Sequence, residues 1–273
     1  MKSSKTPVLD DDIFEEEEEK QQPNPFRIVV GKPILPPTGS KKIVQISSTS
    51  TQKSTSSGGL SAHHLHLLEM ISTNHQFRIL SSFKKFIPEN PLAMFDMLKC
   101  ENIKVVVIGQ SPYPGKCSIT KMNYACGPAF MIPDPVLTCP VSLRNLFREL
   151  RKEFPKKYRD RTVSLSLIKA TVKSWISQGV FLTNLSLTIG TEDDYLRDHK
   201  NLWIPFTIQF VRVVSELVNC PVVLLGKDTW FLSSYARDKV LKFHHPASRD
   251  ESQFLGCDMF KKTNELLEVT IDF

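Results

Sequence analysis

Residues 105–115 read VVVIGQSPYPG, an apolar and mostly β-branched run that passes directly into glycine and polar side chains. Such a near-continuous apolar run is typical of a strand that is buried on both faces of a parallel sheet. Three other runs share the pattern, and each also ends in a polar or glycine-bearing turn: VFLTN at 180–184, VVLLGK at 222–227 and VLKFHHP at 240–246. The sequence therefore predicts four parallel strands.

Amphipathic helices are predicted between these strands. Apolar residues recur at helical spacing in 143–154 and again in 206–217. Strands that alternate with helices predict an α/β fold of three α/β/α layers around a central four-stranded parallel sheet. Ligands of such sheets bind just beyond the carboxyl ends of the strands. We therefore expect the turns that follow the four strands to form one site.

The composition of the chain changes near residue 60. Residues 1–60 combine an acidic block, prolines and serine–threonine runs. This segment has too little apolar surface to offset the entropy of ordering, so we expect it to be a disordered tail. Its eight basic and eight acidic residues cancel, and the net charge of +6 therefore belongs to one domain over 61–273. A positively charged domain fits a polyanionic partner.

Several classes of protein are disfavoured by the same sequence. The six cysteines form no CxxC pair, and the close histidines His63, His64 and His66 have no carboxylate or cysteine partner. These patterns favour reduced thiols and a helix surface over a metal centre. No apolar run approaches the ~18 residues of a membrane span, and no signal-peptide pattern or phosphate-loop motif is present. We expect an intracellular protein without metal, cofactor or membrane attachment.

Four segments resemble the family 1 uracil-DNA glycosylases. VVIGQSPYPG at 106–115 is similar to the family's water-activating loop, usually GQDPYHG, and GVFLTNLSLT at 179–188 is similar to its strand that ends in asparagine. HPASRD at 245–250 resembles the DNA-intercalation loop, usually HPSPLS, and FKKTNELL at 260–267 resembles the closing helix. The order and spacing of the segments also agree, over about residues 78–268.

The resemblance implies a role for each residue of a pocket that receives a base flipped out of DNA. Phe130 would stack on uracil, Asn184 would read its Watson–Crick edge, and Tyr113 would exclude the methyl group of thymine. His245 would donate to the uracil oxygen that gains charge, with help from the backbone N–H of Gln110. Plainer roles stay open: a core phenylalanine, a turn-capping asparagine and a tyrosine that braces its loop.

Contacts to the DNA backbone are also implied by the resemblance. Ser142 ends the segment that corresponds to the family's proline-rich loop, Lys227 replaces the serine of its Gly-Ser pair, and Ser248 is a further candidate for phosphate. Arg249 stands where most members carry the leucine that fills the vacated space. Pro114, Gly226-Lys227 and Arg249 resemble the poxvirus branch, which implies a viral protein that acts in the host nucleus.

Ser111 departs from the family pattern, which has aspartate at this position. That aspartate is assigned to orient or deprotonate the attacking water, and serine cannot accept a proton at neutral pH. Two functions therefore stay open: uracil excision, or a DNA-binding replication factor that has lost turnover. Both would act as a monomer on uracil-containing DNA, and the tail could reach replication proteins. No geometry favours a substitute among the carboxylates of Asp134, Asp250 and residues 192–194.

Overall fold

The computed structural model describes residues 86–158, 163–190 and 197–273. The chain divides into two units, Met1–Gly59 and Leu60–Phe273, and all described residues belong to the second. The predicted tail, the histidines at 63–66 and the acidic residues at 192–194 lie outside the described residues. No described helix has both the length and the apolarity that a membrane crossing requires.

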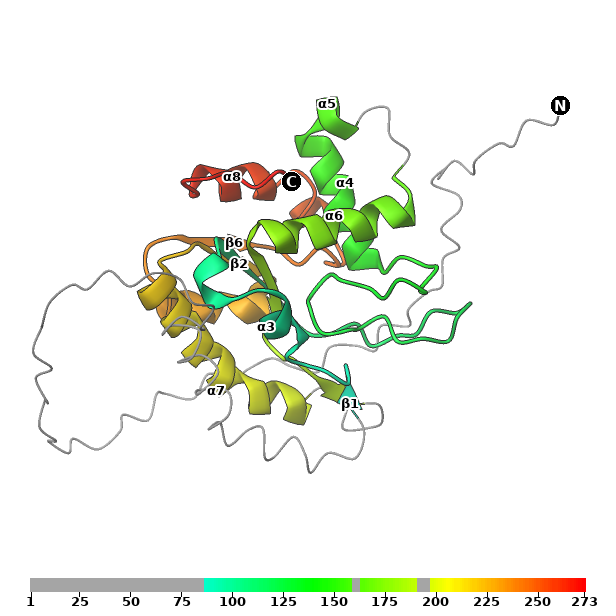
Figure 1. Cartoon of the computed structure of the whole chain (residues 1–273), viewed down its shortest axis with the longest axis horizontal. Helices are drawn as coiled ribbons and strands as arrows, with labels where there is room; N and C mark the ends of the chain where they lie inside the picture. The colour runs from blue at the N-terminus through cyan, green and yellow to red at the C-terminus, as the bar shows by residue number, and fades with distance from the viewer. Residues whose placement is uncertain (1–85, 159–162, 191–196) are drawn as a thin grey trace, which may run out of the picture. The chain divides into compact units, whose positions relative to one another are not determined.

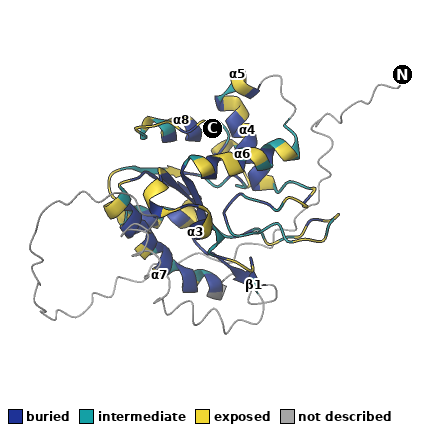
Figure 2. Cartoon of the chain, in the orientation of Figure 1, coloured by how far each residue is buried: buried dark blue, intermediate teal, exposed yellow. Residues whose placement is uncertain are grey.

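A four-stranded parallel sheet forms the centre of the second unit, as predicted. Its strands are β2 (Val105–Gly109), β3 (Val180–Asn184), β5 (Val222–Leu225) and β6 (Val240–Phe243). They lie in the order β3-β2-β5-β6, and each neighbouring pair is parallel. Every residue of β2, β3 and β5 is buried, which explains why these runs are apolar without alternation (Figure 2).

Helices cover both faces of this sheet (Figure 1). On one side lie α4 (Val141–Glu153), α6 (Leu165–Gln178) and α8 (Met259–Glu265), with the short α5 (Pro155–Tyr158) beyond α4. The other side carries α3 (Ala93–Met97) and α7 (Arg197–Val213). The three predicted layers are therefore present.

Aromatic side chains fill the space between the layers. The Trp175 ring of α6 stacks on Phe147 of α4 with the ring centres 5.6 Å apart, and it also contacts Phe260 of α8. Phe95 of α3 meets Phe181 of β3 edge-on at 5.0 Å on the opposite face of the sheet. Each aromatic pair adds roughly 0.5–1.5 kcal/mol beyond the area it buries, so these rings hold the helices against the sheet.

The observed helices differ from the prediction in two places. The predicted helix 206–217 begins nine residues earlier, at Arg197, and changes at Val214 into a π-helical turn, η3 (Val214–Val218). The early start was hidden by Pro205, which lies inside α7 although proline usually begins a helix. Helix α6 was not predicted at all, although the Ser164 hydroxyl caps it by accepting the N–H of Leu167 at 3.2 Å.

Short elements complete the described chain. Strands β1 (Phe86–Ile87) and β4 (Ile189–Gly190) form a small antiparallel pair. Three 3₁₀ helices join longer elements: η2 (Cys100–Asn102), η4 (Lys227–Ser234) and η5 (Glu251–Gln253).

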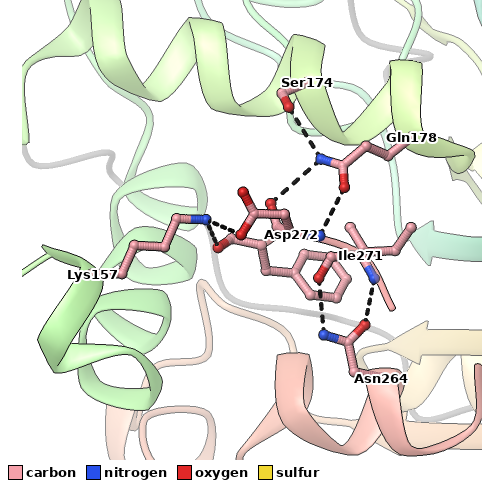
Figure 3. Close-up of polar contacts among 7 residues, drawn as sticks. Lys157, Ser174, Gln178, Asn264, Ile271 and Asp272 are labelled. Carbon is pink, nitrogen blue, oxygen red and sulfur yellow. Dashed lines mark hydrogen bonds and ion pairs between the residues drawn. The ribbon is translucent and has the colours of Figure 1, made fainter. Parts of the chain in front are cut away.

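Residues 271–273 dock onto the layer that contains α5, α6 and α8 (Figure 3). Asn264 of α8 exchanges two hydrogen bonds with the backbone of Ile271, at 2.9 and 2.8 Å. Lys157 of α5 pairs with the Asp272 carboxylate at 2.6 Å. The Phe273 ring is buried against Trp175 and Phe260. This segment therefore belongs to the core of the described unit.

Candidate active site at the carboxyl edge of the sheet

The four turns after the strands lie at one edge of the sheet, as predicted. Strand register places Gly109, the last residue of β2, beside Asn184, the last residue of β3. It also pairs Leu225 with Phe243, and the N–H of Gly226 donates to the Phe243 carbonyl at 2.8 Å. The segments that begin at Gln110, Leu185, Gly226 and His244 therefore leave the sheet together.

Gly109 makes room for two buried side chains at this edge. A Cβ atom at Gly109 would lie only 2.5 Å from the Asn184 Oδ1 atom and 3.5 Å from the Phe130 ring. Asn184 and Phe130 are 6% and 5% exposed, so an amide edge and an aromatic face lie together in a largely dry site. Phe130 also has a φ of 60°, a left-handed conformation that costs roughly 1–2 kcal/mol for a residue with a side chain. Such strain is commonly found at functional sites.

The Gln110 loop is fixed by the backbone of the segment that follows β3. The Leu185 N–H donates to the Gly109 carbonyl at 2.8 Å, and the Ser186 N–H donates to the Gln110 carbonyl at 3.0 Å. The Thr207 hydroxyl of α7 in turn donates to the Leu185 carbonyl at 3.0 Å. These bonds extend the β2–β3 ladder beyond the strands and hold the first part of the loop. Ser111, the next residue, is partly exposed.

Gly226 brings the Gln110 side chain next to His245. A Cβ atom at Gly226 would lie 2.5 Å from the Gln110 Nε2 atom and 3.2 Å from the His245 Cβ atom. Gly226 also has a φ of 97°, which L side chains rarely adopt. The turn after β5 therefore requires glycine for both its shape and its space.

His245 is neutral, and its hydrogen bond decides which ring nitrogen carries the proton. The Ala247 N–H donates to the His245 Nδ1 atom at 3.1 Å, so Nδ1 is an acceptor and Nε2 carries the hydrogen. Burial lowers the pKa of His245 to about 4, and the nearby Asp228 carboxylate opposes this shift only in part. The residue therefore offers a neutral N–H donor. Its neighbour His244 instead packs edge-on against Trp230, with the ring centres 5.4 Å apart.

Tyr113, in the loop that follows β2, contacts Ser142 and Tyr124. The Ser142 hydroxyl donates to the Tyr113 hydroxyl over a long 3.4 Å, and the rings of Tyr113 and Tyr124 meet edge-on at 6.3 Å. Burial raises the pKa of Tyr113, so its phenol stays protonated. Ser142, which was predicted to contact phosphate, is 6% exposed, and its hydroxyl faces Tyr113. Its contact with phosphate stays a prediction.

The predicted phosphate contacts lie at the rim of the site. Lys227 and Arg249 are exposed, and Ser248 is partly exposed. Ser248 belongs to the turn of His245, because its N–H donates to the His245 carbonyl at 2.9 Å. The rim therefore exposes the cations of Lys227 and Arg249, each followed by an exposed carboxylate, Asp228 and Asp250.

Helix α4 holds the loop of residues 245–251 through contacts that were not predicted. The Asn145 side chain donates to the Pro246 carbonyl at 2.9 Å, and Arg148 pairs with Glu251 at 2.6 Å. Asn145 is 1% exposed on the face of α4 that also buries Leu146. A polar residue at a buried helical position was the available signal, since buried polar groups need partners.

Two described candidates for the missing aspartate's role, Asp134 and Asp250, are engaged elsewhere. Asp134 pairs with Lys173 of α6 at 2.8 Å, which lowers its pKa. Asp250 caps η5 by accepting the N–H of Ser252 at 3.0 Å. Within the described ranges, no three histidine, cysteine, aspartate or glutamate residues are grouped to hold a metal ion.

The fold and the site together define an α/β protein that carries an amide, an aromatic ring and a neutral imidazole at the carboxyl edge of a parallel sheet. The uracil-DNA glycosylase of Buchnera aphidicola (strain Tuc7) is 33% identical over 179 residues, which are 63% of this chain and 74% of that relative. The enzyme of the same name from Bordetella avium is 31% identical over 212 residues, 71% of this chain and 75% of the relative. The chain therefore belongs to the uracil-DNA glycosylase family.

Solved structures agree on the fold. The mimivirus uracil-DNA glycosylase superposes with a TM-score of 0.60 at 23% identity and covers 78% of this chain and 86% of its own. The enzyme from Nitratifractor salsuginis superposes with a TM-score of 0.54 at 17% identity, over 76% of this chain and 90% of its own. No protein-family model matches the chain.

Proposed function

We propose that the chain is a family 1 uracil-DNA glycosylase, which hydrolyses the N-glycosidic bond between uracil and deoxyribose in DNA and so initiates base-excision repair. The observation that carries this proposal is the convergence of Asn184, Phe130 and a neutral His245 at one edge of the sheet. These three groups match what a flipped-out uracil offers: a donor–acceptor edge, a flat face and an oxygen that gains charge.

The pocket supplies electrostatic stabilisation where the reaction needs it. As the glycosidic bond breaks, negative charge develops on the uracil ring, and the Nε2–H of His245 can donate to the charged oxygen. A neutral donor in a dry site stabilises such charge more strongly than the same group does in water. Asn184 fixes the edge of the base and Phe130 stacks on its face, so the leaving group is oriented before the bond breaks. The reaction consumes water and requires no cofactor.

The rim of the pocket is suited to a DNA strand. We assign phosphate contacts to Lys227 and Ser248, and we assign to Arg249 the filling of the space that the flipped base leaves. Ser142 would act through Tyr113, because its hydroxyl is buried against that residue. Together with Pro114 and the Gly226-Lys227 pair, Arg249 supports a poxvirus-like branch. This branch implies a viral protein that acts in the host nucleus as a monomer and reaches replication proteins through residues 1–60.

A second candidate function, DNA binding in replication without turnover, is favoured by Ser111. The position lacks a general base, and the described carboxylates of Asp134 and Asp250 are held by Lys173 and Ser252. A retained pocket would then recognise DNA without cleaving it. The two functions differ in a single measurement, the release of uracil.

The deciding experiment incubates the purified full chain with a single-stranded oligonucleotide that contains one uracil. We expect free uracil and an alkali-labile abasic site, and no product from matched oligonucleotides that carry thymine or cytosine. Binding without release at excess protein would reject excision and support the second function. Release at the undiminished parent rate from both a His245→Ala and an Asn184→Ala preparation would identify a contaminating enzyme.

Replacing Tyr113 with alanine is expected to relax the choice of base. The Tyr113 ring is held by Tyr124 and Ser142, so it forms a rigid wall that excludes a methyl group by collision. Excision of thymine, absent in the parent, should become measurable, while uracil excision falls about 10-fold or more as the wall is lost. The measurement is base release from paired uracil and thymine oligonucleotides. Tyr235→Ala, which removes the tyrosine that follows η4 and its cation–π contact with Arg212, is the matched control.

Replacing Gly109 with alanine is expected to displace Asn184. The added Cβ would lie 2.5 Å from the Asn184 Oδ1 atom, which is closer than two such atoms can approach. We expect kcat/KM for uracil to fall about 10²-fold, because misplacing a substrate-positioning group has effects of that size. Gly115→Ala is the control, since its Cβ would meet only the Tyr124 ring, at an ordinary 3.5 Å. If the two variants are equally active, the assignment of Asn184 as a substrate-positioning residue is wrong.

A further inference from the structure

Helices α4 and α5 carry charges of both signs, but only one sign reaches the surface. Within 141–158 the sequence has six basic residues and two acidic ones, Glu149 and Glu153. The two glutamates are 0% and 3% exposed, whereas Arg148, Arg151, Lys152 and Lys156 are all exposed. The outer surface of this helix pair is therefore more positive than its sequence indicates.

The two glutamates are buried because they satisfy backbone groups of the segment that leads into α8. Glu149 accepts the N–H of Asp258 at 2.9 Å and also that of Gly256. Glu153 accepts the N–H groups of Phe260 and Lys261 at 3.1 and 2.7 Å. The first N–H groups of a helix lack partners within it, so these carboxylates have a structural use and face inward.

Three of the exposed basic residues form a stripe without compensating charge. Arg151 and Lys152 lie in the last turn of α4, and Lys156 lies in α5, just after the break at Phe154; the three are called the basic stripe below. The ion pairs on either side of it engage Arg148 with Glu251 and Lys157 with Asp272. Within the described part of the chain, no ion pair engages a residue of the stripe.

The basic stripe continues from the candidate active site along the same helix. Helix α4 begins beside Tyr113, which Ser142 contacts, and its Arg148 holds Glu251 in the loop that carries Arg249. Lys152 lies one turn further on and flanks Gly256, since a Cβ atom there would be 2.6 Å from the Lys152 Nζ atom. A strand that leaves the rim near Ser248 and Arg249 would meet the stripe next.

We infer that the basic stripe binds the phosphodiester backbone of DNA beyond the nucleotides at the pocket. This inference rests on the proposed function, because it takes DNA as the partner of the same molecule. Three uncompensated cations repel one another, and a polyanion relieves that repulsion over the whole stripe at once. Double-stranded DNA carries one charge per ~1.7 Å of its axis, so neighbouring cations on two adjoining helices can face several phosphates. The stripe would lengthen the DNA footprint without entering the chemistry.

The test compares the full chain with a triple variant, Arg151→Gln with Lys152→Gln and Lys156→Gln. The affinity for a long oligonucleotide of about 30 nucleotides is measured at several salt concentrations. The slope of log K against log[salt] should be smaller in magnitude by about 2–3 for the variant, because each lost phosphate contact removes ~0.7–0.9. Its affinity at low salt should fall about 10–100-fold. Uracil release from an oligonucleotide of about five nucleotides should be unchanged, because that length ends before the stripe.

The matched control removes three exposed charges from the opposite edge of the sheet: Lys99→Gln with Lys104→Gln and Arg237→Gln. These residues precede β2 and β6, so their loss should leave the salt slope near that of the parent. The inference is overturned if both triple variants bind long DNA with the same slope. Failure of the parent to release uracil would instead reject the proposed function, and the comparison of slopes would still decide the inference.

Discussion

Replacing His245 with alanine is expected to lower kcat/KM for uracil release about 10²–10³-fold, the usual effect of removing one donor to a developing oxyanion. The Ala247 N–H donates to Nδ1 of the imidazole, and burial keeps the ring neutral, so the hydrogen lies on Nε2. Alanine removes the Nε2–H donor and leaves the oxygen of the leaving base without it. The effect should appear mainly in kcat, because the donor acts on charge that is absent from the ground state.

The pH dependence of the parent protein gives a second measurement of the same residue. Because the pKa of His245 is depressed to about 4, the ring stays neutral as the pH falls through 6.5 and is protonated only near pH 4. Protonation places a hydrogen on Nδ1, which then cannot accept from Ala247. We expect kcat/KM to lose no activity to this group between pH 8 and about 5. An acid limb centred near 6.5, absent from His245→Ala, would contradict a buried neutral imidazole.

His244→Ala is the matched control for both measurements. The His244 ring packs against Trp230 and precedes the turn that directs His245 to the site. Removing the His244 ring should lower the free energy of unfolding somewhat and change the rate of uracil release little. If His244→Ala and His245→Ala lose activity equally, the assignment of the donor to His245 is wrong.

Replacing Ser111 with aspartate is expected to raise kcat for uracil release about 10²–10⁴-fold, the contribution typical of a general base. Ser111 follows a loop whose first part is fixed by the N–H groups of Leu185 and Ser186, so the new side chain would start from a defined position. A carboxylate there can orient the attacking water and accept its proton, whereas the serine hydroxyl can only hold the water. The described carboxylates of Asp134 and Asp250 have other partners, so neither already supplies the base and we expect a large gain.

Ser111→Asn separates basicity from shape. Asparagine has nearly the volume of aspartate but cannot accept a proton, so it should give no comparable gain. Single-turnover rates with excess protein isolate the chemical step from product release. A parent that already matches Ser111→Asp would show that the chain achieves excision without a base at this position. A Ser111→Asp variant that binds DNA and stays inactive would support the binding function.

The four strands and their common edge could be predicted because their signals are local. Each apolar run has the length of a short strand. Each run gives way to a glycine or a polar residue close to the point where the observed strand ends. Parallel pairing brings the carboxyl ends of β2 and β3 together, and the observed register places Asn184 beside Gly109. Family resemblance supplied the roles of Tyr113, Phe130 and His245, but the contacts around them come only from the structure.

The contacts of α4 could not be predicted because they join residues far apart in the chain. Asn145 binds Pro246, and Glu149 binds the backbone near Asp258, over separations of more than 100 residues. A local pattern shows that such residues interrupt an apolar face, but it does not name their partners. The protonation of His245 was hidden for the same reason, since it depends on burial and on the Ala247 N–H. The contact of Ser142 with Tyr113 was hidden too, because it joins residues 29 positions apart.

The two buried glutamates of α4 also have a consequence for the solvent exchange of backbone hydrogens. Amide hydrogens in the first turn of a helix usually exchange quickly with water, because they have no partner within the helix. Those of Asp258, Phe260 and Lys261 are instead bound to carboxylates buried inside the protein. Opening this short helix would leave two buried carboxylates without donors, so its first amides can exchange only when α4 separates from it. Deuterium uptake there thus reports on the joint opening of two helices.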